Sequence, residues 1–299
     1  MKFIIKKKLL LPVLFAFIGI NFLSYLGAYQ LTHYRQTERK KLGFPRPKHY
    51  QLPSDKGLNY TTKKIEISNN QWLETWSIEP ATVTNKGTVI LFHGKDNTKS
   101  TLIEPAIAFH HLGYRTLLVD FRGVGGSSGN ISTIGVKESQ DVATVVNYVR
   151  DRYLEPVILY GVSMGSAAIL RAIAKYNIDP DAIILELPFA RLISAVKFRL
   201  KRSKVPAFPL TELFVFWGGV QHGFNGFIHN PVDYARQVNC PTLILYGEQD
   251  VTVDRTGIEE LFNNIPTQKK LVGFADAKHQ MLVNIQPQLW KKSVANFLN

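Results

Sequence analysis

The sequence contains a single cysteine, Cys240, and has no recognisable metal-binding or cofactor-binding motif. One cysteine excludes an intramolecular disulfide, so cysteine usage says little about the redox compartment. The glycine-rich run at 123–129 lacks the G-x-G-x-x-G spacing of a dinucleotide-binding loop, and no phosphate-binding loop is found. We therefore expect neither a metal nor a cofactor.

The chain also lacks internal repeats and long low-complexity tracts. It has 299 residues, of which 45% are hydrophobic. When one membrane segment is set aside, about 250 residues remain, which suits one large α/β domain better than two small ones.

The net charge of +13 is unevenly distributed. Residues 1–48 hold 10 Lys and Arg side chains and one acid, Glu38, and therefore contribute +9. Residues 49–299 contribute the other +4. The excess surrounds an apolar N-terminal segment, where anionic lipid headgroups are the natural partner. The distribution favours a membrane lipid surface as a partner and argues against nucleic acid.

The N-terminal segment has the length and polarity of a transmembrane helix. Residues 9–31 contain no charged side chain and follow four lysines. Their helical length of about 34 Å exceeds a hydrocarbon core of about 30 Å. We predict that residues 1–35 form a basic flank and a signal anchor spanning about 9–31, which makes the protein single-pass. A cleaved signal peptide is the alternative, but cleavage after Gly27 or Ala28 would leave a large residue at position −3.

Basic residues flank the apolar segment on both sides. The positive-inside rule therefore nearly cancels, and the side of the membrane on which the catalytic domain lies stays open. Residues 36–59, rich in prolines and charges, are predicted to be a linker. Residues 60–299 are predicted to be the catalytic domain.

Strand and helix patterns alternate from residue 60 onward. Two early segments, 63–68 and 72–78, alternate polar and apolar residues, as expected of a half-exposed antiparallel pair. Helix-length segments such as 133–153 and 164–176 separate the short apolar runs that follow. These runs are 88–92, 116–120, 157–160, 182–185 and 242–246. The pattern predicts a mostly parallel central sheet with helices on both faces and reacting groups at the carboxyl ends of its strands.

The run Gly161-Val162-Ser163-Met164-Gly165 lies between a buried strand and an apolar helix. In this context a serine takes a strained conformation and its Oγ points out of the sheet. The flanking glycines are needed because larger side chains would collide in so sharp a turn. We predict that Ser163 is a nucleophile.

A serine hydroxyl needs a base to take its proton, and the base needs an acid to orient it. In this topology the acid and then the histidine follow the serine along the chain. Asp250 and His279 each follow a predicted strand in that order, and we predict that they are the acid and the base. Glu186 and Glu248 also lie near strand ends and remain alternative acids.

The segment His93-Gly94-Lys95 directly follows the strand at 88–92. The loop in this position supplies a backbone N–H to an oxyanion hole, and the residue after the nucleophile supplies another. We predict that the backbone amides of Lys95 and Met164 are these donors. The ring of His93 is predicted to bond to nearby loop backbone.

Residues 60–299 resemble the α/β-hydrolase superfamily, most closely its membrane-anchored lipases, esterases and thioesterases. The resemblance rests on His93-Gly94, the run from Asp120 to Ser127, Gly161–Gly165, Gly247–Asp250 and His279. It implies the α/β-hydrolase fold, with Asp120 and Arg122 tying their loop rather than reacting. Related anchored enzymes often have Asn where this chain has Lys95.

About fifty residues separate the sixth and seventh predicted strands, more than a simple crossover needs. The superfamily commonly places a cap here, and we expect a cap insert at about 187–235. Residues 191–204 hold six basic side chains and no acid, and an aromatic-rich stretch follows. This composition fits an element that faces anionic lipid, or equally a cap packed on the core with a solvated basic face.

Together these features predict a serine hydrolase that cleaves a carboxylic ester or thioester of a lipid-like acyl substrate. The expected partners are the lipid surface and this small acyl substrate, and the oligomeric state stays open. An aminopeptidase or amidase would use the same three residues. A catalytically silent lipid-binding or scaffold protein of the same fold is the alternative from another class.

Overall fold

The computed structural model describes residues 7–34, 51–68, 70–253 and 255–298. The basic residues at Lys2 and Lys6 and most of the predicted linker, residues 36–50, lie outside the described residues.

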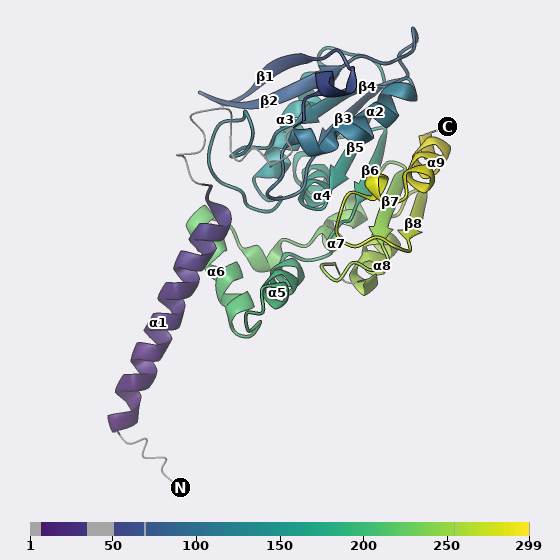
Figure 1. Ribbon diagram of the computed structural model, residues 1–299. Helices are drawn as coiled ribbons and strands as arrows, with labels where there is room; N and C mark the ends of the chain where they lie inside the picture. Colours follow the sequence, from purple (N-terminus) through teal and green to yellow (C-terminus); the bar gives the residue numbers. More distant parts are fainter. Residues whose placement is uncertain (1–6, 35–50, 69, 254, 299) are drawn as a thin grey trace.

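Eight strands form a single sheet in the order β1-β2-β4-β3-β5-β6-β7-β8 (Figure 1). Their bounds are β1 Thr61–Ser68, β2 Gln71–Ile78, β3 Thr88–Phe92, β4 Arg115–Val119, β5 Val157–Val162, β6 Ala182–Glu186, β7 Thr242–Gly247 and β8 Lys269–Phe274. The pairs β1–β2 and β2–β4 are antiparallel, and the other five neighbouring pairs are parallel. The sheet is therefore mostly parallel, as predicted.

Helices cover both faces of this sheet. Successive residues of a strand point to opposite faces, so each central strand contributes side chains to both apolar clusters. The helices are α1 Lys7–Thr32, α2 Ile103–His111, α3 Glu138–Arg150, α4 Met164–Tyr176, α5 Leu192–Arg202, α6 Leu210–His222, α7 Pro231–Tyr234, α8 Arg255–Asn264 and α9 Pro287–Leu298. In β3, Ile90 and Phe92 join the apolar cluster formed with α3, α4 and α8. Val89 and Leu91 join the opposite cluster, formed with α2 and α9.

The helix predicted over 133–153 is shorter in the structure, and that prediction was wrong at its N-terminal end. Helix α3 begins at Glu138, because Ile134 and Gly135 have φ angles of 55° and 101°, which a right-handed helix does not allow. The Glu138 carboxylate accepts hydrogen bonds from the backbone N–H groups of Thr133 (2.8 Å) and Gly135 (3.0 Å). Residues 133–137 are therefore a loop closed by the first residue of the helix.

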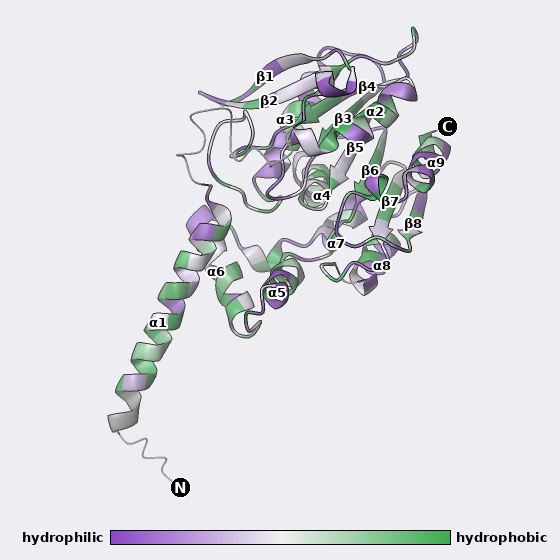
Figure 2. Cartoon of the chain, viewed as in Figure 1, coloured by the Kyte–Doolittle hydropathy of each residue, from purple (hydrophilic) through white to green (hydrophobic). Residues whose placement is uncertain are grey.

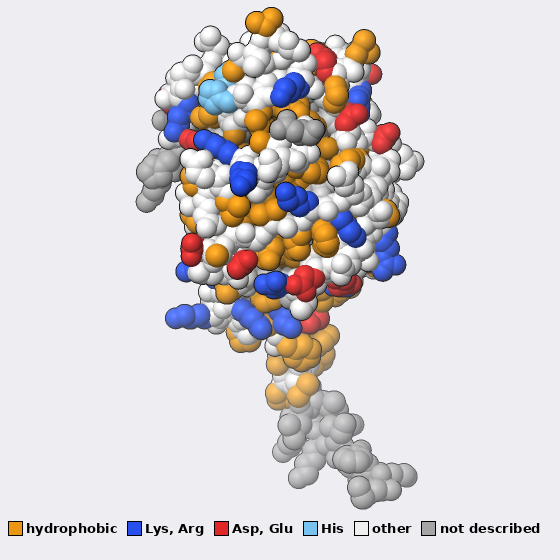
Figure 3. Space-filling model, turned by 90° about the vertical axis from the view of Figure 1, so that its right-hand side faces the viewer, with side chains coloured by type: hydrophobic (Ala, Val, Ile, Leu, Met, Phe, Trp, Pro, Cys, Tyr) orange, Lys and Arg blue, Asp and Glu red, His pale blue; other side chains and the backbone are white. Residues whose placement is uncertain are grey.

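Helix α1 extends away from the domain as a long apolar rod (Figures 1 and 2). Its segment Leu11–Thr32 is long and apolar enough to cross a membrane, which fits either an anchor or a signal sequence. The side chains at 11–18 are exposed, whereas the C-terminal half of the helix contacts α6. Figure 3 shows Lys and Arg side chains around the place where this apolar stem leaves the globular part.

Helices α5 and α6 lie between β6 and β7 in the sequence, within the predicted cap insert. They lie between α1 and the end of the domain that holds β7 and β8 (Figure 1). Most side chains of α5 are partly or fully exposed, and Leu192 and Leu200 are its buried residues. Helix α5 is thus attached to the domain by few buried side chains and is well placed to border a cavity.

Candidate active site

Ser163 occupies the turn between β5 and α4 in a strained conformation, with φ 51° and ψ −106°. The turn closes tightly around it. A Cβ on Gly161 would lie 2.6 Å from the carbonyl carbon of Gly165, and a Cβ on Gly165 would lie 2.4 Å from the backbone oxygen of Phe92. Because neither position has room for a side chain, the two glycines of the G-x-S-x-G sequence are a steric requirement of this turn.

A chain of hydrogen bonds runs from Ser163 through His279 to Asp250. The imidazole Nε2 lies 3.1 Å from the Ser163 Oγ, and Nδ1 lies 2.7 Å from the Asp250 Oδ2. The other carboxylate oxygen accepts the backbone N–H groups of Thr252 (2.7 Å) and Val253 (3.2 Å). The carboxylate is thereby fixed, and it holds the ring with Nε2 facing the hydroxyl.

The two alternative acids do not contact His279 in this way. The Glu186 carboxylate is fully buried and accepts hydrogen bonds from the Tyr160 hydroxyl (2.7 Å), the Leu282 N–H (2.8 Å) and the Trp290 Nε1–H (2.7 Å). Burial raises its pKa, and these donors oppose the shift. Glu248 is exposed at the end of β7. Of the three candidate acids, Asp250 is the one that is hydrogen-bonded to the His279 ring.

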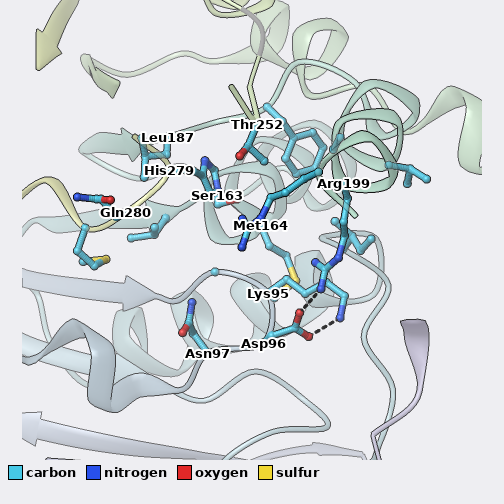
Figure 4. A pocket seen from close by; sticks show the side chains of 18 of the residues that line it. Lys95, Asp96, Asn97, Ser163, Met164, Leu187, Arg199, Thr252, His279 and Gln280 are labelled. Carbon is cyan, nitrogen blue, oxygen red and sulfur yellow. Dashed lines mark hydrogen bonds and ion pairs between the residues drawn. The ribbon is translucent and has the colours of Figure 1, made fainter. Parts of the chain in front are cut away.

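The predicted oxyanion donors both line the cavity beside the serine (Figure 4). Met164 is the first residue of α4, so its N–H lies in the turn where helical amides lack an intrahelical acceptor. Lys95 follows Gly94 in the loop after β3. The ring of His93 accepts the Phe121 N–H at Nε2 (3.1 Å), while its Nδ1 lies 2.7 Å from the Gly94 oxygen. Its role as a brace for this loop agrees with the sequence prediction.

The loop after β4 is tied by charged side chains, as the sequence predicted. The carboxylate of Asp120 accepts the N–H of Gly126 (2.9 Å) and pairs with Lys99, whose side chain is fully buried. Arg122 pairs with the buried Asp141, and burial raises the pKa of Asp141 to about 6 although Arg122 opposes the shift. These contacts fix the loop after β4, whose Phe121 N–H is bonded to His93.

A cavity of about 520 Å³ opens beside Ser163 and His279. A volume of this size is typical of small-molecule sites. Its wall combines apolar side chains from the strand ends and α5 with a charged group at one side. The apolar members include Ile134, Leu187, Phe189, Ala195, Val196 and Met281.

The charged group centres on Asp96, which the sequence did not mark as important. Lys95 and Arg199 each donate to its carboxylate at 2.6 Å (Figure 4), and the hydroxyl of Tyr34 donates at 3.3 Å. Burial alone would raise the pKa of Asp96, but the two cations outweigh burial and the pKa is lowered. Burial lowers the pKa of Lys95 against the opposing effect of Asp96. One carboxylate thus joins the loop after β3, the cap helix α5 and the short segment that follows α1.

Arg202 also lines the cavity, so three cations and one carboxylate face it among the described lining residues, with Asp250 behind His279. The sequence showed Arg199 and Arg202 only as part of a basic stretch, because nothing in a helix pattern reveals which charges turn toward a cavity. Within the described residues, no group of three or more His, Cys, Asp or Glu side chains could hold a metal ion.

Comparison with known proteins gives related sequences and a matching fold. A family model described as serine aminopeptidase, S33, matches residues 84–218. The lysophosphatidylserine lipase ABHD12 of Mus musculus is 25% identical over 284 residues, which cover 83% of this chain and 66% of that protein. An uncharacterized protein of Bacillus subtilis, YqkD, is 24% identical over 216 residues, covering 71% of each chain. The chain thus spans about two thirds of the length of the mouse lipase.

Among solved structures, the Pyrococcus furiosus esterase Pf2001 superposes with a TM-score of 0.71 at 25% identity. The superposition covers 87% of this chain and 97% of the esterase. The esterase from Exiguobacterium antarcticum matches with a TM-score of 0.61 at 16% identity and supports the fold alone. The fold predicted from the sequence motifs is confirmed.

Proposed function

The chain is an α/β-fold serine hydrolase of the esterase and lipase type, and we propose that it cleaves the ester bond of single-chain acyl lipids through Ser163, His279 and Asp250. The observation that carries the proposal is the continuous hydrogen-bonded chain from Asp250 through His279 to Ser163, which ends at a cavity large enough for a small acyl substrate.

In the first half of the reaction, His279 takes the hydroxyl proton as the Ser163 Oγ attacks the substrate carbonyl. Asp250 keeps the proton on Nδ1 and stabilises the imidazolium that forms. The bond to the leaving alcohol then breaks, and His279 returns the proton to the alcohol oxygen. The product of this half is an ester between the acyl group and Ser163.

In the second half, water replaces the alcohol. His279 takes a proton from the water as its oxygen attacks the acyl carbonyl, and it then protonates Ser163 as the acyl bond breaks. The negative charge on the carbonyl oxygen is stabilised in both halves by the backbone N–H groups of Lys95 and Met164. The amide of Met164 also lies at the positive end of the α4 dipole.

The charge of the cavity favours an anionic lipid headgroup over a free amine. Asp96 already bonds to Lys95 and Arg199, and Arg202 adds a further cation, so a substrate ammonium group would meet net positive charge. This argues against aminopeptidase action, although the matching family model is described by that activity. The mouse relative is named for its action on lysophosphatidylserine, which is an anionic lipid.

We also propose that α1 is an uncleaved membrane anchor. In this assignment residues 1–35 form the basic flank and the anchor, 36–59 the linker, and 60–299 the catalytic domain with its cap at about 187–235. The packing of α1 against α6 supports retention of the helix, because a cleaved signal would not need a specific seat on the mature domain.

A fluorophosphonate probe tests the nucleophile. The folded protein should be labelled, whereas Ser163→Ala should not, and His279→Ala should lose turnover while keeping lipid binding. A panel of p-nitrophenyl esters, acyl-CoA thioesters, amino-acid anilides and lysophospholipids separates ester, thioester and amide cleavage. Failure of the probe to label folded wild-type protein would overturn the proposal.

The anchor is tested in sealed vesicles. The full chain should remain in the membrane after carbonate extraction with its N-terminus intact by mass spectrometry. Protease added outside the vesicles then reports which side holds the catalytic domain. Recovery of a mature chain that begins after residue 28 would show that the segment is a cleaved signal.

A further inference from the structure

Helix α1 is seated on the cap helix α6 by specific contacts over its C-terminal half. The Tyr25 backbone oxygen accepts the Gln221 side-chain amide (2.8 Å), and the Tyr25 ring contacts the Trp217 ring edge-on at 5.5 Å between centroids. Gly27 lies so close to Phe214 that a Cβ there would come within 2.8 Å of its ring. Small residues at such a contact let two helices approach closely, as in membrane helix pairs.

With α1 as the membrane anchor proposed above, this packing places α6 at the depth of the membrane. The segment Leu11–Thr32 measures about 33 Å as a helix, so nearly all of it is needed to cross a core of about 30 Å. Because α6 contacts the C-terminal half of that segment, α6 must enter the same leaflet. Its lipid-facing side is apolar, with Phe216 and Val220 about half exposed.

An apolar hollow of about 50 Å³ lies between α1, α5 and α6. Ala28, Leu31 and Thr32 of α1 line it on one side, and Phe214 and Val215 of α6 line another. Apart from Thr32 and Thr133, the residues that line it are apolar, so the hollow suits an acyl chain better than water.

The hollow and the Ser163 cavity share part of their walls. Ile134 and Val196 line both spaces, so these two side chains form the partition between them. An acyl chain that extends from the Ser163 carbonyl site past Ile134 would enter the hollow. The hollow has room for the end of such a chain, and the larger cavity holds the rest.

Ile134 is held at this partition against its own backbone preference. Its φ of 55° is unfavourable for a β-branched residue, which is rare in the left-handed region. The surrounding contacts compensate: the His229 ring lies 3.0 Å from the Ile134 oxygen, and Glu138 fixes the residues on either side, Thr133 and Gly135. Strained residues that are fixed in this way cluster at ligand-binding sites.

We propose that the membrane helix α1 forms part of the substrate site, and that the end of the substrate acyl chain lodges in the hollow between α1 and α6, past the Ile134 partition. This inference rests on the proposed esterase function and adds to it a chain-length determinant supplied by the anchor. The anchor residues that face the hollow, Ala28 and Leu31, thereby set which acyl chains fit.

The test compares two tryptophan substitutions on the same helix. Leu31→Trp fills the hollow, whereas Leu23→Trp lies on the outer side of α1, where Leu23 is 67% exposed. The full chain in lipid nanodiscs is assayed with p-nitrophenyl butyrate and palmitate. Leu31→Trp should lower the palmitate-to-butyrate ratio of kcat/KM by about fourfold for each excluded methylene. Leu23→Trp should keep the wild-type ratio.

A second variant approaches the hollow from the cavity side. Ile134→Ala removes most of the partition and should raise the relative kcat/KM for the longest esters. This variant decides the matter if Leu31→Trp does not fold. Wild-type chain-length profiles in the folded variants would overturn the inference and leave the esterase function intact. Absence of ester turnover in the wild type would instead overturn the proposed function.

Discussion

The Asp250 carboxylate lies 2.7 Å from His279 Nδ1 and is almost entirely covered, with 2% of its side chain exposed against 23% for the histidine. Because the carboxylate is covered, water does not compete for the hydrogen bond that it accepts from His279. Two backbone N–H groups fix its orientation. The ring of His279 therefore has one favoured tautomer, with its free Nε2 lone pair directed at Ser163.

Replacing Asp250 with Asn tests how much catalysis depends on that tautomer of His279. An amide N–H facing Nδ1 would favour the wrong proton position, and we expect kcat for ester hydrolysis to fall by roughly four orders of magnitude. Glu248→Gln, which alters the exposed neighbouring acid, is the matched control and should keep wild-type kcat. A comparable loss in Glu248→Gln would reassign the acid.

The serine turn should not tolerate one added methyl group. Gly165→Ala would place a Cβ 2.4 Å from the Phe92 backbone oxygen, so the start of α4 must shift and move Ser163. We expect loss of fluorophosphonate labelling and a lower melting temperature. Gly19→Ala is the control, since nothing lies within 4 Å of its Cβ. Normal labelling of Gly165→Ala would show that the turn can relax.

Glu186→Gln should affect stability more than chemistry. Three donors face the Glu186 carboxylate, and an amide would present an N–H to at least one of them. We expect the free energy of unfolding to fall by about 1–3 kcal/mol, measured by denaturant titration in detergent. The kcat of the folded variant should stay far above that of Asp250→Asn. The opposite order would favour Glu186 as the acid that serves His279.

His229 should make stability depend on pH below neutrality. Burial lowers its pKa from 6.5 to about 4, with the bond to the Ile134 oxygen opposing the shift. The folded state therefore requires the neutral ring, so its stabilisation is complete above pH 6.5 and is lost as the pH falls toward 4. The loss should reach about 3 kcal/mol at pH 4.

His229→Gln removes the titrating group and keeps a donor for the Ile134 oxygen. The free energy of unfolding of this variant, followed from neutral pH to pH 4, should fall less steeply than that of the wild type. Parallel curves for the two proteins would show that other groups cause the acid sensitivity.

The cations at the cavity should discriminate between headgroups. Arg202→Gln should lower kcat/KM for a lysophosphatidylserine more than for an uncharged monoacylglycerol of the same chain. The difference should be severalfold at low salt and shrink as salt rises, because the Arg202 side chain is exposed and its charge is screened. Asp96→Asn should shift the preference the other way, since it frees Lys95 and Arg199. Equal effects on both lipids would exclude a headgroup role.

Much of the sheet could be predicted from the sequence because its strands are short runs of buried apolar residues. The predicted strand at 88–92 has the same bounds as β3. The turn at Ser163 could be predicted because its two glycines are typical of a sharp turn between a strand and a helix. Asp250 and His279 could be chosen because both follow predicted strands and both come after the serine in the order that this topology requires. These features are local, or they follow from topology.

Other features depend on contacts between distant segments. The start of α3 was misplaced because Glu138 bonds back to Thr133, which hydrophobic periodicity does not reveal. The bond from Arg199 to Asp96 joins residues 103 positions apart. The packing of α1 against the domain is weakly indicated in the sequence by Ser24 and Ala28. These small residues lie one helical turn apart, and both are buried.

The attachment of α1 to α6 also decides how such an enzyme meets its substrate. A catalytic domain on a loose tether samples a volume of solvent, whereas one whose cap is packed on its anchor stays at a constant height and tilt relative to the lipid plane. Encounter then becomes a two-dimensional search by lateral diffusion. Turnover should follow the mole fraction of substrate within the bilayer. Adding inert lipid should therefore slow the reaction even when the total amounts of enzyme and substrate are unchanged.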